Sequence, residues 1–194
     1  MRGKPSWNKR VEKAKEQLKI ESVSIEEIES ILSECLKEKK IDGVVKRISL
    51  EGTHINYEQI SEKCKTSDAG HLIWIVFLKD GHVAVVGAGK DIGFPTKGKI
   101  GTGYILDCLR IEGKNVEWNK NEVIIIPIKG LTTSSVGIPK DKEHYRCLLE
   151  CRNGVEHCIG EYLLKNNVPI INLYSHKNYS DSFWNTCENN GFLL

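Results

Sequence analysis

The chain has 194 residues, of which 40% are hydrophobic and 28% charged, as is usual for a globular protein. It contains no run of the roughly 20 apolar residues that a membrane helix needs, and its N-terminus lacks the apolar stretch of a secretory signal. We therefore expect a cytosolic protein with no membrane partner. Seven cysteines, an odd number without an export signal, argue against a disulfide framework and predict reduced, buried thiols.

The first predicted helix is basic, although the net charge of the whole chain is only +2. Ser6 as N-cap and an apolar stripe at helical spacing, Trp7, Val11, Ala14 and Leu18, predict an amphipathic helix that ends near residue 19. Its cations are a candidate surface for the phosphates of nucleic acid. The residues in question are Arg2, Lys4, Lys9, Arg10 and Lys13. A solvated helix face with no ligand is the alternative interpretation.

The second predicted helix is acidic. Residues 20–38 carry six Glu and one Lys, and Ser24 with Glu27 three positions later forms a capping box. The apolar period continues from Ile25 to Leu36 and ends before Gly43. Residues 44–50 alternate as a short strand, and residues 57–64 are typical of a third helix.

A β-hairpin is the strongest strand signal. Residues 71–78 (HLIWIVFL) and 82–86 (HVAVV) are rich in β-formers and are joined by Lys79-Asp80-Gly81, which is typical of a tight turn. A glycine-rich stretch, residues 87–103, follows. Such a stretch either lets the backbone approach a ligand closely or is a flexible loop.

The remaining elements are mixed. Residues 104–109 fit a helix or a strand, and residues 122–128 predict a buried strand despite Pro127. We expect two helices, at residues 141–151 and 155–165, that are separated by Asn153-Gly154. An extended segment is predicted at residues 170–173, and a last helix at residues 181–188. Together these elements predict an α/β (α+β) fold, in which helices flank a small, mainly antiparallel sheet with a central hairpin. We expect a helical, partly basic region at residues 1–65 and an α/β module at residues 66–194.

Two further ligand sites match the sequence only in part. Gly93 to Lys99 fits the G-x-x-x-x-G-K part of a phosphate-binding loop, but Ile100 stands where Ser or Thr would hold magnesium. The predicted hairpin strand also ends at Val86, too far before the loop. A zinc site would use His144, Cys147, Cys151, His157 and Cys158. Because these residues contain no C-x-x-C pair, buried structural cysteines are the favoured interpretation.

The order of elements from residue 71 to 175 resembles the GIY-YIG nuclease family. A hairpin is followed by a basic loop, a buried strand, a helix with Glu161, and then Pro169-Ile-Ile-Asn172. The resemblance implies an endonuclease that uses Mg²⁺ or Mn²⁺, with Glu161 as the metal ligand and Asn172 in a supporting role. The two name-giving tripeptides of the family are replaced by Ile75-Val76-Phe77 and Val85-Val86-Gly87, so both family tyrosines are missing. The family arginine is missing as well, because the loop after Gly87 contains no arginine.

Phosphodiester hydrolysis also needs a cation for the developing charge and a base for the attacking water. The candidates that replace the missing groups are Tyr104 as the phenol, His82 as the base, and Lys99 or Lys90 as the cation. His157 lies one helical turn before Glu161 and is a candidate neighbour of the ligand. Each also has an ordinary structural interpretation.

The sequence therefore predicts a metal-dependent DNA endonuclease of the restriction or defence type. Cleavage of both DNA strands would need two active sites, which favours a homodimer. The first alternative is an inactive module that binds nucleic acid on the same scaffold. The second is a small-ligand or protein-interaction domain without a nucleic-acid role.

Overall fold

The computed structural model describes residues 4–49, 54–55, 71–89, 92–94, 101–128 and 152–172. Within these ranges the chain has an α+β fold, which confirms the predicted fold class. The helices are α1 (Lys4–Gln17), α2 (Ile25–Glu38), α4 (Gly101–Ile111) and α6 (Arg152–Lys165). The strands are β1 (Lys46–Ser49), β2 (His54–Ile55), β3 (His71–Phe77), β4 (Val83–Gly89), β5 (Ile92–Gly93) and β6 (Glu122–Ile128). Every helix in the described ranges is too short or too polar to cross a bilayer.

Four of the strands form an antiparallel sheet in the order β1-β6-β3-β4. The predicted hairpin is confirmed as β3 and β4. Its turn depends on Gly81, whose φ of 94° lies in the left-handed region that favours glycine. Strand β2 pairs with β5 in a separate two-stranded sheet.

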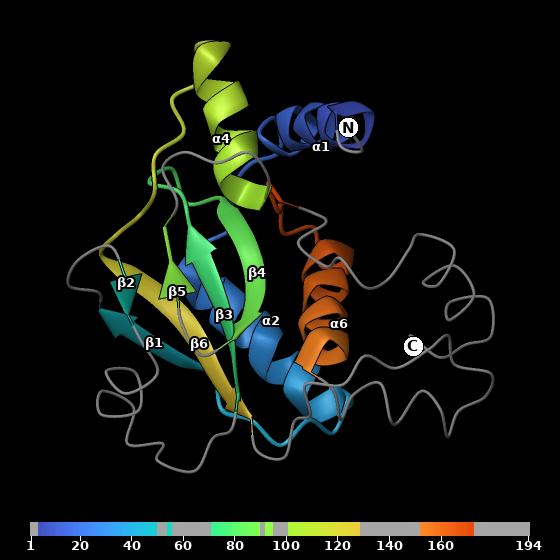
Figure 1. Ribbon diagram of the computed structural model, residues 1–194. Helices are drawn as coiled ribbons and strands as arrows, with labels where there is room; N and C mark the ends of the chain where they lie inside the picture. Colours follow the sequence, from blue (N-terminus) through green and yellow to red (C-terminus); the bar gives the residue numbers. More distant parts are fainter. Residues whose placement is uncertain are drawn as a thin grey trace.

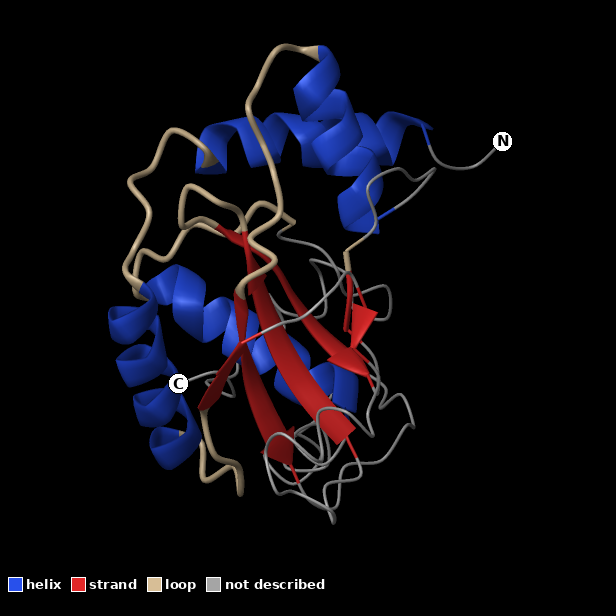
Figure 2. Ribbon diagram, turned by 90° about the vertical axis from the view of Figure 1, so that its left-hand side faces the viewer, coloured by secondary structure: helices blue, strands red, loops and turns tan. Residues whose placement is uncertain are grey.

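Helices α2 and α6 pack on one face of the four-stranded sheet, as Figures 1 and 2 show. Alternate residues of β3 and β6, such as Ile73, Ile75 and Ile124, point into this layer together with Leu32 and Ile159. All of these side chains are fully buried. This packing explains the apolar positions of α2 that face the sheet.

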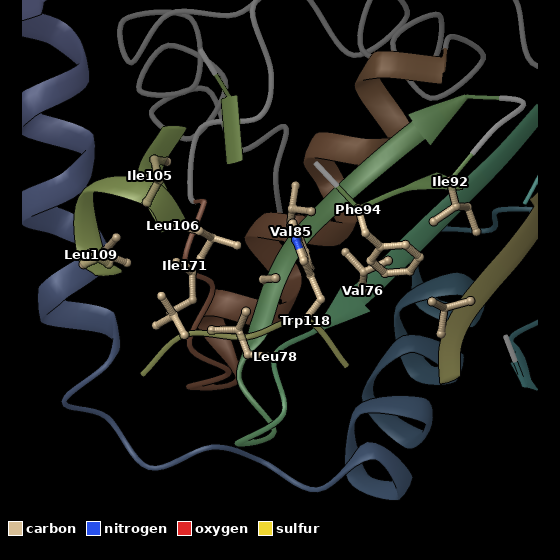
Figure 3. Packing of buried hydrophobic residues seen from close by; sticks show 14 of the residues in the cluster. Val76, Leu78, Val85, Ile92, Phe94, Ile105, Leu106, Leu109, Trp118 and Ile171 are labelled. Atoms are coloured by element: carbon tan, nitrogen blue, oxygen red, sulfur yellow. The ribbon is translucent and has the colours of Figure 1, made fainter. Parts of the chain in front are cut away.

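Helix α4, with α1 packed against it, covers part of the opposite face near the hairpin turn (Figure 1). Figure 3 shows Leu106 and Leu109 of α4 in the same cluster as Leu78, Val85 and Ile171. Phe94 and Trp118 close the cluster with an edge-on contact, at a centroid distance of 5.5 Å. Because both faces of the sheet are covered here, β3 is an almost continuous apolar run rather than an alternating one.

Three local predictions are corrected or resolved. Ser6 is not the N-cap of the first helix, because α1 begins at Lys4 and carries Pro5 in its first turn, where a missing N–H breaks no helical bond. Asn153-Gly154 does not interrupt a helix, since both residues lie in the first turn of α6. The segment that fitted either a helix or a strand, residues 104–109, is helical and belongs to α4.

Strand β1 connects the N-terminal region to the rest of the fold, because it pairs with β6 from Lys46↔Ile125 to Ser49↔Glu122. Pro127 lies past the end of this ladder, so its missing N–H removes no bond to β1. The predicted boundary at residues 65–66 lies outside the described residues. So do the helices predicted at residues 57–64, 141–151 and 181–188.

Candidate functional site

Asn172 is held beside the start of β4, the edge strand of the sheet. Its backbone N–H donates to Ala84 O at 2.9 Å, and the N–H of Ile171 donates to Val83 O at 2.9 Å. Its side chain is 3% exposed, and Nδ2 donates to Thr102 Oγ1 at 2.8 Å. Oδ1 is buried and accepts no hydrogen bond from the residues that the structure describes. A buried acceptor without a donor costs free energy, so its retention calls for an explanation.

Thr102 places Asn172 at the N-terminus of α4. This helix starts at Gly101, whose φ is +74°, and has no acidic residue in its first turn. The first N–H groups of a helix lack intrahelical partners and, with the helix dipole, favour a bound anion. In Figure 1 this end of α4 lies next to the chain that follows α6. The buried amide and a helix N-terminus therefore share one location.

Tyr104, predicted as a catalytic phenol, lies in the first turn of α4, two residues after Thr102. Its ring is partly buried against the core cluster on this face. Contact with the thiol of Cys108, one turn later, raises the pKa of the Tyr104 phenol. The phenol therefore stays protonated at neutral pH and can donate a hydrogen bond rather than act as a base. The structure thus brings two predicted residues, Tyr104 and Asn172, to the same turn of α4.

The glycine-rich segment leads directly into this turn. Strand β5 ends at Gly93 and α4 begins at Gly101, so a strand does precede the loop and a helix does follow it. This corrects one reason for setting the phosphate-loop interpretation aside. However, β5 pairs antiparallel with β2 in a separate sheet, and Ile100 still stands at the magnesium-binding position. Lys90 and Lys99, the predicted cations, lie outside the described residues.

Glu161, the predicted metal ligand, is on α6 and is partly exposed. The first half of this helix is more deeply buried than the sequence suggested. Glu156 is 7% exposed and His157 6%. The sequence does not single out Glu156. Val155 and Ile159 mark the face of the helix that packs against the sheet. They do not reveal that the other sides of the helix, where Glu156 lies, are buried as well. Within the described residues, three or more acidic, histidine or cysteine side chains do not gather at any point.

His82, the predicted base, lies at the end of the hairpin turn rather than on an open strand face. Its side chain is buried, and Nε2 donates to Ile20 O at 2.9 Å. Nδ1 is 3.1 Å from Asp80 Oδ1 but makes no hydrogen bond among the described residues. Ser22 Oγ also donates to the carbonyl oxygen of Asp80, at 3.0 Å. His82 thus fastens the α1–α2 linker to the hairpin turn, and we do not carry it into the candidate site.

The basic helix α1 is docked on the fold. Val11 and Ala14 are buried in the core cluster that α4 shares. Lys9 and Lys13 are exposed on its outer surface and Arg10 is half-buried, whereas Lys4 belongs to the first turn and Arg2 lies outside the described residues. The carboxamide of Gln17 accepts a hydrogen bond from the N–H of Ile170 at 3.1 Å. The segment that carries Asn172 is therefore attached to the basic helix as well as to α4.

Cys158, from the zinc hypothesis, and Lys79, which lines a surface pocket, each contact another side chain of the protein. Cys158, one of the five residues of the rejected zinc site, lies against Cys35 of α2, and both cysteines are reduced and buried. His144, Cys147 and Cys151 lie outside the described residues. A pocket of about 300 Å³ lies between the hairpin turn, the end of α4 and the segment before β6. Its cations are Lys79, Arg110 and Lys120, and Lys79 is paired with Glu117 at 2.5 Å.

Comparison of the chain with protein-family models, curated proteins and solved structures found no match. The functional argument therefore depends on the site itself.

Proposed function

We propose that the chain is a divalent-metal-dependent DNA endonuclease whose substrate backbone lies across the N-terminus of α4 and Asn172. The observation that supports this most is the buried amide oxygen of Asn172, which has no donor among the described residues although it lies at a helix N-terminus. The N-terminus of a helix binds anions, whereas an amide oxygen binds a cation or a hydrogen-bond donor. A phosphodiester accompanied by a hydrated cation satisfies both.

The residues around this turn have distinct tasks in the proposal. The N–H groups of the first turn of α4 bind a phosphate oxygen. The phenol of Tyr104, which contacts the thiol of Cys108, lies in the same turn. Lys99 or Lys90, the cations predicted from the sequence, supplies positive charge as the phosphate becomes more negative. The Asn172 oxygen orients a water molecule or a water bound to the cation.

Magnesium is the cation that the family resemblance implies. Mg²⁺ keeps several of its waters and is commonly held by one or two carboxylates together with the substrate phosphate, so it needs no cluster of three protein ligands. Glu161 would be the carboxylate, as the GIY-YIG resemblance implies, and Asn172 would contact the hydration shell. When bound, the metal would polarise the phosphodiester and lower the pKa of an attacking water.

The exposed cations of α1 support DNA as the substrate. Lys9 and Lys13 lie on a helix that is hydrogen-bonded, through Gln17, to the segment carrying Asn172. Contacts between such cations and backbone phosphates add affinity without sequence preference, and this affinity falls as salt is added. The helix would therefore hold the duplex beside the cleavage site.

An inactive nucleic-acid-binding module is the second candidate function, and one observation favours it. Both segments that correspond to the family tripeptides are in the core: Ile75, Val76 and Phe77 are fully buried, and Val85 and Val86 are nearly so. The hairpin therefore offers no hydroxyl group at those positions. In this alternative the site at α4 binds phosphate without cleaving it.

The deciding experiment measures cleavage and binding of the same DNA. Supercoiled plasmid is incubated with the protein and Mg²⁺ or Mn²⁺, while fluorescence anisotropy follows a labelled duplex in EDTA. The variants are Glu161→Gln and, as a matched control, Glu21→Gln, which alters an exposed carboxylate outside the site. The endonuclease proposal expects cleavage that Glu161→Gln abolishes and Glu21→Gln retains. Binding without cleavage would select the inactive module, and the absence of both would exclude a nucleic-acid role.

A further inference from the structure

The pocket of about 300 Å³ at the C-terminal end of α4 carries more positive than negative charge. Among the described residues that line it, the cations are Lys79, Arg110 and Lys120, and the one carboxylate is Glu117. Contact with Lys79 lowers the pKa of Glu117, and the charges of Arg110 and Lys120 lower it further. Because the carboxylate is ionised at neutral pH, the pocket has a net charge of +2.

The backbone around this pocket is fixed by the fold. Trp118, which lines the pocket, is 3% exposed and belongs to the core cluster that α4 shares. The N–H of Asn119 donates to Phe77 O, and the N–H of Lys79 donates to Glu117 O, both at 2.9 Å. The segment before β6 is thereby attached to the end of β3 and to the hairpin turn. The pocket is therefore formed before a ligand binds, which lowers the entropic cost of binding.

Arg110 has a fixed position in the wall of the pocket. It is half-buried in the last turn of α4, and its Nε donates to Val116 O at 2.9 Å. The carbonyl oxygens of Cys108, Leu109 and Arg110 accept hydrogen bonds from the N–H groups of residues 112–114. These bonds reduce the negative potential that a helix dipole directs at its C-terminus. The end of α4 is therefore compatible with a bound anion.

The ion pair between Lys79 and Glu117 is largely in contact with solvent, since the two side chains are 68% and 55% exposed. Pairs this exposed contribute little free energy, because water and salt screen the two charges. Lys79 can therefore exchange the carboxylate of Glu117 for a bound anion at small cost.

We propose that this pocket binds a phosphate monoester, whose charge of nearly −2 at neutral pH matches that of the pocket. The three cations come from the hairpin turn, from α4 and from the segment before β6, so they approach from different directions. A terminal phosphate group presents three oxygens to such an arrangement, whereas a carboxylate presents two in one plane. A DNA backbone phosphodiester has only one negative charge. The proposal is independent of the endonuclease function, because Asn172 contacts the opposite end of α4.

The first probe is inorganic phosphate, a tetrahedral dianion at about pH 8, added to ¹⁵N-labelled protein at constant ionic strength. The Nε–H signal of Arg110 is assigned by its loss in Arg110→Lys, and its shift reports occupation of the pocket. Lys120→Gln and Lys114→Gln each remove one exposed lysine, but only Lys120 lines the pocket. We expect Lys114→Gln to bind phosphate as the wild type does, and Lys120→Gln to bind at least about fivefold more weakly. Glu117→Gln removes the opposing charge and should bind at least about fivefold more tightly.

Duplex oligonucleotides with and without 5′-phosphates identify the source of the phosphate group. If only the phosphorylated duplex moves the Arg110 signal, the ligand is a nucleic-acid end. If inorganic phosphate moves it and neither duplex does, the ligand is a small phosphorylated molecule. Both results support a monoester site.

Four outcomes would overturn the inference. The Arg110 signal could fail to respond to phosphate, or succinate, a dianion with planar carboxylates, could move it at the same concentration. Lys120→Gln and Lys114→Gln could weaken binding equally, which would indicate a general effect of net charge. An unphosphorylated duplex could move the signal as strongly as the phosphorylated one, which would show that a phosphodiester is sufficient.

Discussion

The indole of Trp74 on β3 lies directly over Gly87 on β4. The two residues face each other in the register of the hairpin, and a Cβ added to Gly87 would lie only 2.3 Å from Trp74 Cη2 and Cζ2. The glycine is therefore required by the tryptophan side chain rather than by a turn. Gly87 is also the last residue of Val85-Val86-Gly87, the segment that corresponds to the second family tripeptide.

Gly87→Ala is expected to destabilise the protein by about 1–3 kcal/mol, because the ring must move out of a packed cluster to admit one methyl group. Chemical denaturation of the variant and the wild type measures the difference. Trp74→Leu provides the matched test, since it removes the ring from above the glycine. We expect Gly87→Ala to cost much less in the Trp74→Leu background. An equal cost in both backgrounds would show that the clash with Trp74 is not the cause.

Ser24 caps α2, and its replacement tests how much the best-predicted helix depends on that cap. Ser24 Oγ accepts a hydrogen bond from the N–H of Glu27 at 3.2 Å. Ser24→Ala should lower the free energy of unfolding by about 1 kcal/mol. Ser30→Ala removes the same hydroxyl from an exposed position inside the helix, where alanine is the better helix former. If the two variants lost the same stability, the capping bond would not be responsible.

The elements with local signals could be predicted from the sequence. The capping box at Ser24 and the tight turn at Gly81 each fix a nearby backbone geometry, and both elements are where the pattern placed them. The start of α6 was missed because Asn153 and Gly154 usually break helices. In the first turn, however, their N–H groups need no intrahelical acceptor. Tertiary contacts of α6 with β4 and α2 then outweigh local propensity.

The candidate site was only partly predictable, because its two halves come from distant parts of the chain. Asn172 and Tyr104 were each singled out from their order in the sequence. Nothing local indicated that Thr102 would meet Asn172, since 70 positions separate them and the contact arises where the chain after α6 returns along β4. The hairpin pattern predicts His82 at the start of the second strand, but that pattern alone does not reveal that the α1–α2 linker covers its turn.

The thiols of Cys35 and Cys158 predict a loss of stability at alkaline pH. The pKa of the Cys35 thiol lies far above its ordinary value of 9.0. The main cause is contact with the thiol of Cys158, and burial of Cys35 is the second. A raised pKa in the folded state gives a stabilising contribution that is complete below pH 9 and declines above it, as the unfolded thiol ionises and the folded one does not. The decline is at most about 1.4 kcal/mol per pH unit for one thiol.

Cys35→Ala isolates this effect from other groups that titrate at high pH. The variant should be less stable than the wild type at pH 8, because a buried side chain has been shortened. That difference should shrink between pH 9 and 10.5, where only the wild type loses the thiol contribution. Ile28→Val, which shortens a buried side chain of α2 with no titrating group, should differ from the wild type by the same amount at every pH. A constant difference for Cys35→Ala would contradict the assigned pKa.

His82 is expected to matter for stability and not for cleavage. His82→Ala leaves the carbonyl of Ile20 without its donor in a part-buried position, which should cost about 1–3 kcal/mol. Ser22→Ala removes the neighbouring bond to Asp80 O and should cost less, because Ser22 is the more exposed of the two residues. Plasmid cleavage by both variants is measured well below their unfolding temperatures. Rates close to that of the wild type would fit a structural role, because the imidazole is directed at the α1–α2 linker. A folded His82→Ala protein that no longer cuts DNA, beside an active Ser22→Ala protein, would instead restore His82 as the base that its position in the sequence suggested.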